Sequence, residues 1–327
     1  MTRFAIVGAG IAGVSLAHRL VQSNHDCTVF EKSQEVGGRL ATEQFEDWQV
    51  DYGTQYFTVR TSKFMQEVEV WHSNGWIKHW SVTPWVLERE TFSPSPDDHV
   101  RYVGTRSMNC MVQEMSRGLN VYLNTRIDRL ERQNDQWRIW DEHGEHYGMF
   151  DIVLLTAPLA QSLALLPSGT IAETSLRTSA MSPIWVYALS LKQASGIEAD
   201  ALFSNDGLVT WAAKNSSKPN RDATYETWVM HFAPQWTANH LDASEELLRH
   251  QAIHLLDVLA GHDVGPIHGS FRYRWLYARA SSKEITIPQW DANMKIGLAG
   301  DWTLGNCLED AWLSAQSLAD QLLDFYL

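Results

Sequence analysis

The stretch Phe4-Ala5-Ile6-Val7-Gly8-Ala9-Gly10-Ile11-Ala12-Gly13 joins an apolar strand to closely spaced glycines, and it decides how this chain begins to fold. Gly8 permits a sharp turn, Gly10 lets the backbone approach a pyrophosphate, and Gly13 lets a helix lie close to the sheet. The amides at the start of that helix favour an anion. Eighteen residues after Gly13 a second apolar stretch ends in Glu31, whose carboxylate can accept hydrogen bonds from ribose hydroxyls. The stretch predicts a site for FAD or NAD.

Two later segments favour FAD. Lys32 leads into Gly37-Gly38-Arg39, where the glycines let the backbone pass close to a long cofactor and the guanidinium can face its phosphates. Much later in the chain, a short apolar strand ends at Gly300-Asp301, and Glu309-Asp310-Ala311 leads into a helix. Asp301 can hold ribityl or ribose oxygens, and the helix N-terminus can place amides near the flavin ring.

These motifs, together with Asp51-Tyr52-Gly53-Thr54-Gln55-Tyr56-Phe57-Thr58, resemble the flavin-dependent amine oxidase superfamily. The segments 211–219, 228–231 and 274–279 resemble the bacterial members of its renalase branch, so that the resemblance covers nearly the whole chain. It implies noncovalently bound FAD. The residues assigned to the cofactor are Gly8, Ala9, Gly10, Ile11, Ala12, Gly13, Glu31, Lys32, Gly38, Arg39, Gly53, Thr54, Gln55, Tyr56, Ile127, Ala157, Gly300, Asp301, Glu309 and Ala311.

The resemblance implies an α/β fold in which a Rossmann-like FAD-binding domain is interleaved with an α+β substrate domain, as in amine oxidases and p-hydroxybenzoate hydroxylase. Residues 1–60, 98–160 and 291–327 are assigned to the FAD-binding domain, and residues 61–97 and 161–290 to the substrate domain. The residue pattern also predicts a strand over 121–127 and a long helix over about 243–260.

Composition excludes several classes of partner. Twenty-six basic residues against thirty-nine acidic ones give a net charge of −13, which argues against binding to nucleic acid or to anionic membranes. No run of eighteen apolar residues occurs and the chain begins with a fold strand rather than a signal peptide, so we expect a cytoplasmic protein. Cys27, Cys110 and Cys307 are widely spaced, and the thirteen histidines lack ligand spacing, so we expect no metal.

The middle of the chain offers candidates for binding a substrate. Lys214, Lys218 and Arg221, with Asn215 among them, form a compact basic cluster that can bind the diphosphate of a nucleotide, although a solvated polar loop explains them equally well. No second G-x-G-x-x-G occurs between residues 100 and 290. A nicotinamide compound would therefore bind over the flavin ring, in the substrate cavity.

Aromatic residues beside the motifs complete the predicted substrate site. Trp211, Trp275 and Trp302 can wall a pocket for a flat ring, although most of the fifteen tryptophans must be core. His231 fits a structural role as well as a substrate contact. For Arg272, Arg274 and Arg279, alternation along a strand favours outward-facing charges over a second cationic edge.

No Ser-His-Asp or Cys-His set is present, and we predict no catalytic side chain, because flavin N5 would accept the hydride. The resemblance implies oxidation of the 2- and 6-dihydro isomers of NAD(P), with dioxygen as the acceptor and NAD(P)⁺ and hydrogen peroxide as products. Two other functions stay open. One is an FAD-dependent amine oxidase or desaturase of the same superfamily, and the other is a non-catalytic dinucleotide-binding protein.

Overall fold

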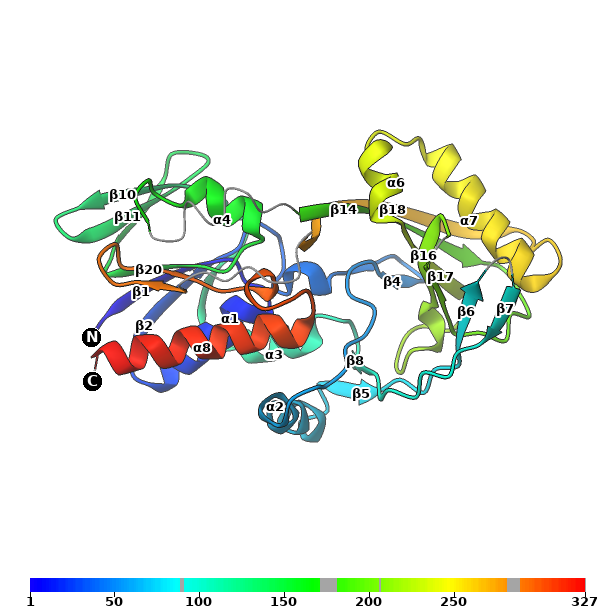
Figure 1. Ribbon diagram of the computed structural model, residues 1–327, viewed down its shortest axis with the longest axis horizontal. Helices are drawn as coiled ribbons and strands as arrows, with labels where there is room; N and C mark the ends of the chain where they lie inside the picture. The colour runs from blue at the N-terminus through cyan, green and yellow to red at the C-terminus, as the bar shows by residue number, and fades with distance from the viewer. Residues whose placement is uncertain (89–90, 171–180, 206, 281–288, 327) are drawn as a thin grey trace.

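A mostly parallel sheet and a mostly antiparallel sheet organise the computed structural model, and they lie at opposite ends of the molecule (Figure 1). The structure describes residues 1–88, 91–170, 181–205, 207–280 and 289–326. The chain starts in the parallel sheet, enters the antiparallel sheet between residues 84 and 94, and returns to the parallel sheet between residues 120 and 155. It crosses to the antiparallel sheet again between residues 181 and 280 and returns near residue 290. This path gives two interleaved halves.

The first sheet has β1 (Arg3–Val7) near its centre, and β1 pairs in parallel with β2 (Asp26–Phe30) and β13 (Ile152–Leu155). These strands are almost wholly apolar because helices or strands cover both of their faces. The order is completed by β9 (Asn120–Tyr122) beside β2, and by β20 (Ile296–Leu298) and the antiparallel edge strand β19 (Trp290–Asp291) beside β13.

Alternate residues of β1 enter different cores. Phe4 and Ile6 pack with helices, whereas Ala5 and Val7 pack with a small second sheet, as the period of two along a strand requires. The helices are α1 (Ile11–Gln22), α3 (Cys110–Ser116) and α8 (Leu308–Tyr326). The small sheet contains β10 (Ile127–Gln133), β11 (Gln136–Asp141) and β12 (His146–Phe150), and α4 (Leu159–Leu165) lies beside it.

Within the described residues, the antiparallel sheet has seven strands, of which β15 and β6 form the one parallel pair. Helices α6 (Pro234–Asn239) and α7 (Glu245–Ala260) cover its outer face (Figure 1). Its strands, in order, are β18 (Ile267–Ala280), β14 (Met181–Leu191), β17 (Glu226–Phe232), β16 (Val209–Lys214), β15 (Ala201–Ser204), β6 (Pro84–Glu88) and β7 (Thr91–Pro94).

We call the other face of this sheet the inner face. Val186, Ala213 and Val229 project from it into the same apolar core that holds Phe4 and Ile6 of the first sheet. A single core therefore runs from one half of the molecule to the other. The inner face, rather than the face under α6 and α7, looks toward the predicted cofactor site.

Several further elements lie between the strands of these sheets and the main helices. They are the hairpin β3 (Thr42–Gln44) and β4 (Gln49–Asp51), helix α2 (Ser62–Ser73), the pair β5 (Ile77–His79) and β8 (Tyr102–Gly104), and the 3₁₀ turns η1 (Gly38–Leu40), η2 (Asn215–Ser217) and η3 (Asp301–Thr303). Phe64 of α2 packs on Trp312 of α8, with ring centroids 5.4 Å apart. None of the described helices is long and apolar enough to span a lipid bilayer.

The predicted fold class is confirmed, and α7 matches the predicted long helix. The predicted strand over 121–127 is wrong. β9 ends at Tyr122, and β10 begins only at Ile127. Asn124 between them has φ +52°, a left-handed conformation that interrupts an extended strand. Strands β6 and β7 join the antiparallel sheet, whereas α2 packs on α8. The exact domain boundaries stay a prediction.

Candidate active site

The glycine-rich turn after β1 has the backbone geometry that a pyrophosphate requires. Gly8 has φ +111°, and a Cβ on Gly13 would lie 1.9 Å from the Gly8 carbonyl oxygen, so both positions require glycine. A Cβ on Gly10 would meet nothing within 4 Å, which leaves the approach to the backbone open. Helix α1 begins at Ile11 with no side-chain cap and no acidic residue in its first turn, so its amides stay available to an anion.

Glu31 stands at the end of β2 beside this turn. Its buried carboxylate accepts hydrogen bonds from the backbone N–H groups of Ala9 and Ser33, each at 2.9 Å. Oε2 therefore fixes the turn, while the remaining acceptor capacity of the carboxylate can serve ribose hydroxyls. Lys32, the next residue, is exposed.

A second glycine pair closes over the first turn. Gly37 donates its N–H to the Ala9 carbonyl at 2.8 Å, and both Gly37 (φ +122°) and Gly38 (φ +56°) adopt conformations that favour glycine. A Cβ on Gly38 would lie 3.4 Å from the Gly10 Cα. The two glycine loops thus lie backbone to backbone. This is the narrow cradle expected for the diphosphate of a dinucleotide.

Arg39 ties this cradle to the other half of the molecule. Its guanidinium forms a bidentate pair with Asp301, with Nη1 at 2.8 Å from Oδ2 and Nη2 against Oδ1. Nη1 also donates to the carbonyl of Ala278 on β18 at 2.9 Å. Gly300 and Asp301 follow β20, so residues 262 positions apart meet at one point. The sequence assigned Arg39 and Asp301 to the cofactor separately, and the structure pairs them with each other.

The segment after Asp51 passes close to Arg39. A Cβ on Gly53 would lie 2.0 Å from the Arg39 carbonyl oxygen, and the Thr54 N–H donates to that same oxygen at 2.8 Å. Gln55 is buried and donates to the carbonyls of Asp51 and Gly53, so its side chain shapes the loop. Tyr56 is partly exposed and lies on the side of the inner face.

The remaining predicted cofactor residues occupy different surroundings. Ala157 adjoins the first turn, because its nitrogen would lie 3.1 Å from a Cβ on Gly8. Ala311 lies in the first turn of α8. The Glu309 carboxylate accepts hydrogen bonds from the backbone N–H groups of Arg60 and Thr61 and from the Thr61 hydroxyl, at 2.6 to 2.8 Å. Ile127 is buried in the core under the small sheet. Only the backbone atoms of Glu309 and Ile127 therefore remain available for the predicted cofactor contacts.

Four side chains form an aromatic wall on the inner face: Tyr56, Trp211, His231 and Trp275. Trp211 and His231 are opposite each other in the β16–β17 register, and the Tyr56 and Trp211 rings lie 5.3 Å apart. Trp275 stacks on Tyr52 at 5.5 Å and donates its indole N–H to the Tyr52 carbonyl. All four members are partly exposed. The wall provides flat apolar surface next to the cofactor loops.

The polar atoms of this wall are partly unsatisfied. His231 Nε2 and Trp211 Nε1 are enclosed, and neither finds a hydrogen-bond partner among the described residues. Burial lowers the pKa of His231 to about 3, and the positive charges of Lys218 and Arg279 contribute to the same shift. His231 is therefore uncharged at neutral pH. Sequence reasoning named it as a candidate but could not give its charge state.

The structure contradicts the predicted diphosphate site at Lys218 and Arg221. Both side chains are fully buried against Asp51 of β4: Lys218 Nζ lies 2.9 Å from Asp51 Oδ2, and Arg221 Nη2 lies 3.0 Å from the same oxygen. Burial raises the pKa of the Asp51 carboxyl, but the two cations outweigh burial and hold it at about 2. These charges neutralise a carboxylate inside the fold, so they do not face a substrate.

The structure also contradicts the predicted substrate contacts of Asn215, Lys214 and Trp302. Asn215 is buried, and its amide bonds to the backbone of Gln49 and of Asp51. Lys214 reaches the outer side of the sheet, where Nζ donates to the Ile197 carbonyl at 2.7 Å. Trp302 is enclosed in the core of the first half and donates to the Ala157 carbonyl. Charge and aromatic content could not show which face of a strand each side chain would take.

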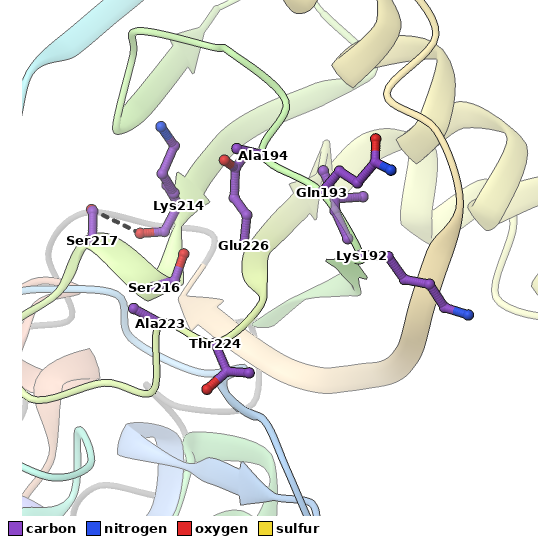
Figure 2. Close-up of a pocket in the computed structure, with 10 residues that line it drawn as sticks. Lys192, Gln193, Ala194, Lys214, Ser216, Ser217, Ala223, Thr224 and Glu226 are labelled. Carbon is purple, nitrogen blue, oxygen red and sulfur yellow. Dashed lines mark hydrogen bonds between the residues drawn. The ribbon is translucent and has the colours of Figure 1, made fainter.

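One pocket of about 250 Å³ lies at the ends of β14 and β16 and the start of β17. Figure 2 shows Lys214, Ser216, Ser217 and Glu226 among the residues that line it. Its polar groups already bond locally, since Ser216 accepts the Thr227 N–H and Glu226 accepts the Ser195 hydroxyl and the Trp228 indole. No predicted cofactor residue lines this pocket. It is separate from the aromatic wall.

Comparisons with known proteins agree with this geometry. Residues 6–68 match the model of an NAD(P)-binding Rossmann-like domain, and residues 88–323 match that of flavin containing amine oxidoreductases. Two solved structures share the fold over almost the whole chain. A proposed protoporphyrinogen oxidase from Exiguobacterium sp. 255-15 has a TM-score of 0.80 at 14% identity and covers 98% of each chain. Cyclohexylamine oxidase from Brevibacterium oxydans IH-35A has a TM-score of 0.79 at 12% identity and covers 99% of each.

Similarity to curated proteins is confined to short segments. An L-amino-acid oxidase of Sistrurus catenatus edwardsii is 47% identical over 51 residues, which are 16% of this chain and 10% of that protein. The chain thus matches only about a tenth of that relative's length. The cradle of glycines, the uncapped start of α1 and the paired Arg39 and Asp301 fit a flavin dinucleotide. The chain belongs to the flavin containing amine oxidoreductase family, a family of oxidoreductases that use FAD.

Proposed function

We propose that this protein oxidises isomeric dihydronicotinamide dinucleotides, the 2- and 6-dihydro forms of NAD(P), as the renalases that its motifs resemble do. The overall reaction converts a dihydro-NAD(P), dioxygen and one proton into NAD(P)⁺ and hydrogen peroxide. FAD, when bound, supplies the chemistry by accepting the hydride and passing two electrons to dioxygen. The side chains have no acid or base step to perform, because a dihydropyridine loses only hydride as it becomes aromatic.

The charge around the aromatic wall carries this proposal. Lys218 and Arg279 both act on His231, and Arg101 and Arg279 both act on Tyr56. Asp51 is already shared by two cations, and Asp97 is paired with Arg101. The wall therefore faces a positive field. Such a field favours a flat uncharged ring attached to phosphates and opposes a protonated amine.

Three parts of the chain support the work that the proposal requires. The glycine loops, Glu31 and Arg39 would hold the cofactor through its ribose and diphosphate. The aromatic wall would orient the dihydropyridine ring by stacking. The neutral His231 would add no charge that could oppose the positive charge developing on the ring during hydride loss.

A runner-up function is that of an amine oxidase or a desaturase, as in the neighbours and relatives named for those activities. Cyclohexylamine oxidase shares the fold, and a 4,4'-diapophytoene desaturase of Staphylococcus haemolyticus is 41% identical over 49 residues. The positive field at the wall disfavours an ammonium substrate. It does not oppose an amino acid, whose carboxylate an arginine could bind.

Anaerobic mixing of the holoenzyme with separate dihydro isomers tests the proposal through the loss of oxidised-flavin absorbance. We expect the 2- or 6-dihydro isomers to reduce the flavin about a hundredfold faster than ordinary NADH, because a misplacement of about 1 Å costs that much. Putrescine, cyclohexylamine and L-leucine serve as comparison substrates. Equal rates for all isomers, or faster reduction by an amine or amino acid, would refute the proposed function.

A further inference from the structure

Hydrogen bonds join the backbone on both sides of Arg279 to the cofactor half of the molecule. It lies on β18, opposite Ser182 of β14. On one side, the Ala278 carbonyl accepts a hydrogen bond from Arg39 at 2.9 Å. On the other side, Ala280 donates its N–H to Asn306 Oδ1 at 2.6 Å and accepts from Asn306 Nδ2 at 3.2 Å. These contacts place Arg279 where the inner face meets the cofactor loops.

The side chain of Arg279 is exposed and forms no ion pair or hydrogen bond with any residue that the structure describes. Other arginines near the two halves' junction are already occupied. Arg39 pairs with Asp301, Arg101 with Asp97, and Arg221 with Asp51. A cation that finds no anion within the described part of the chain is notable in a protein of net charge −13. Its five N–H donors remain available to a ligand.

The charge of Arg279 acts on the aromatic wall. It contributes to the lowered pKa of His231, after burial and Lys218. It also acts on Tyr56, whose pKa is raised by burial, a shift that the charges of Arg101 and Arg279 oppose. Two members of the wall, on different segments, therefore lie within the field of one exposed guanidinium. A flat ring stacked on the wall would bring any attached anion toward this group.

We propose that Arg279 binds the phosphate groups of the dinucleotide substrate and thereby sets the preference for an anionic substrate. This inference rests on the proposed function. It replaces the predicted role of Lys218 and Arg221, whose charges are buried against Asp51. A guanidinium can bind phosphate oxygens through two parallel N–H donors, which a single ammonium cannot match.

The test compares two substrates that share a ring and differ in charge. One is the dihydro isomer of NAD that reduces the wild-type flavin fastest, and the other is the matching N-methyl dihydronicotinamide, which lacks phosphate. Stopped-flow reduction of holoenzyme gives the dissociation constant and limiting rate for wild type, Arg279→Ala and Arg279→Lys. Arg272→Ala is the matched control, because Arg272 lies on the same strand, is exposed and faces Glu245 instead.

We expect Arg279→Ala to raise the dissociation constant of the dinucleotide by about 10- to 100-fold and to leave that of the N-methyl compound unchanged. Arg279→Lys should recover part of the affinity, and Arg272→Ala should match wild type. A change that is equal for both compounds, or no change for either, would overturn the proposal. Weakened FAD binding in Arg279→Ala, with unchanged substrate affinity, would assign the guanidinium to the cofactor instead.

The same experiment separates this inference from the proposed function. If no dihydronicotinamide reduces the wild-type flavin but L-leucine does, the proposed function fails. Arg279→Ala is then measured with L-leucine and with its methyl ketone analogue, which keeps the amino group and lacks the carboxylate. A loss of affinity confined to the carboxylate would retain Arg279 as the anion-binding residue and change only the substrate class. Equal affinities would remove both conclusions together.

Discussion

Replacing Lys218 by methionine removes an ammonium from the buried cluster with Asp51 and Arg221 while keeping most of the side-chain volume. In the structure Nζ donates to Asp51 Oδ2 at 2.9 Å and to Gln55 Oε1 at 3.0 Å, with no exposed side-chain surface. Breaking a buried ion pair costs about 3 to 5 kcal/mol. Arg221 remains beside Asp51, so we expect a loss near the lower end, about 3 kcal/mol in the free energy of unfolding.

The assay is urea unfolding of the holoenzyme, followed by tryptophan fluorescence. Lys192→Met is the matched control, because Lys192 is exposed on the same half of the molecule, and we expect it to change stability by less than about 0.5 kcal/mol. Substrate affinity of the folded Lys218→Met protein should fall by less than about threefold, because Lys218 contributes to the field at the wall but contacts Asp51 rather than the substrate. If stability equals that of wild type while the KM for the dinucleotide rises about tenfold, Lys218 is a substrate ligand and the buried-cluster reasoning is wrong.

Two further predictions concern the cofactor and His231. Glu31→Ala should weaken FAD binding by about 1 to 3 kcal/mol, measured by titrating apoprotein with FAD, because the ribose hydroxyls lose a charged acceptor. The wild-type protein should release its FAD on heating. Flavin retained on the chain after acid precipitation would contradict noncovalent binding. The pKa of His231 falls from 6.5 to about 3 on folding, so the unfolded chain binds more protons between these values and stability falls as the pH drops below about 7. His231→Gln should therefore lose less stability than wild type between about pH 7 and pH 4, and identical acid-unfolding profiles would contradict the shifted pKa.

Local backbone requirements explain why much of the cofactor site was predictable from the sequence. Gly8 is required by its own backbone conformation, with φ +111°, and Gly13 by its contact with the Gly8 carbonyl oxygen, so both requirements arise inside the stretch that begins at Phe4. Glu31 follows at a spacing set by a single helix and strand. Such requirements arise within a short stretch of the chain, so the residue pattern predicts where each of these residues lies in the structure. The confirmed fold class was implied by the family resemblance that these motifs carry together.

The substrate side was less predictable because its partners are distant in sequence. Lys218 and Arg221 were interpreted as an exposed basic cluster, but their common partner, Asp51, precedes them by 167 and 170 residues. The sequence around Lys218 does not indicate that the Asp51 carboxylate lies beside it in the fold. The reverse holds for Arg279. Alternation along β18 predicted a charge that faces away from the site, whereas in the structure the charge of Arg279 acts on Tyr56 and His231. Which charge is neutralised is a property of the tertiary fold.

The interleaving of the two halves has a consequence for synthesis of the chain. Glu31 and the glycine turn are translated early, but Asp301, which pairs with Arg39, and strand β20 of the same sheet are made nearly three hundred residues later. The ion pair that ties the cofactor cradle to the other half of the molecule therefore cannot form until residue 301 has left the ribosome. A nascent chain must keep the apolar edge of β13 covered by other means until β20 arrives.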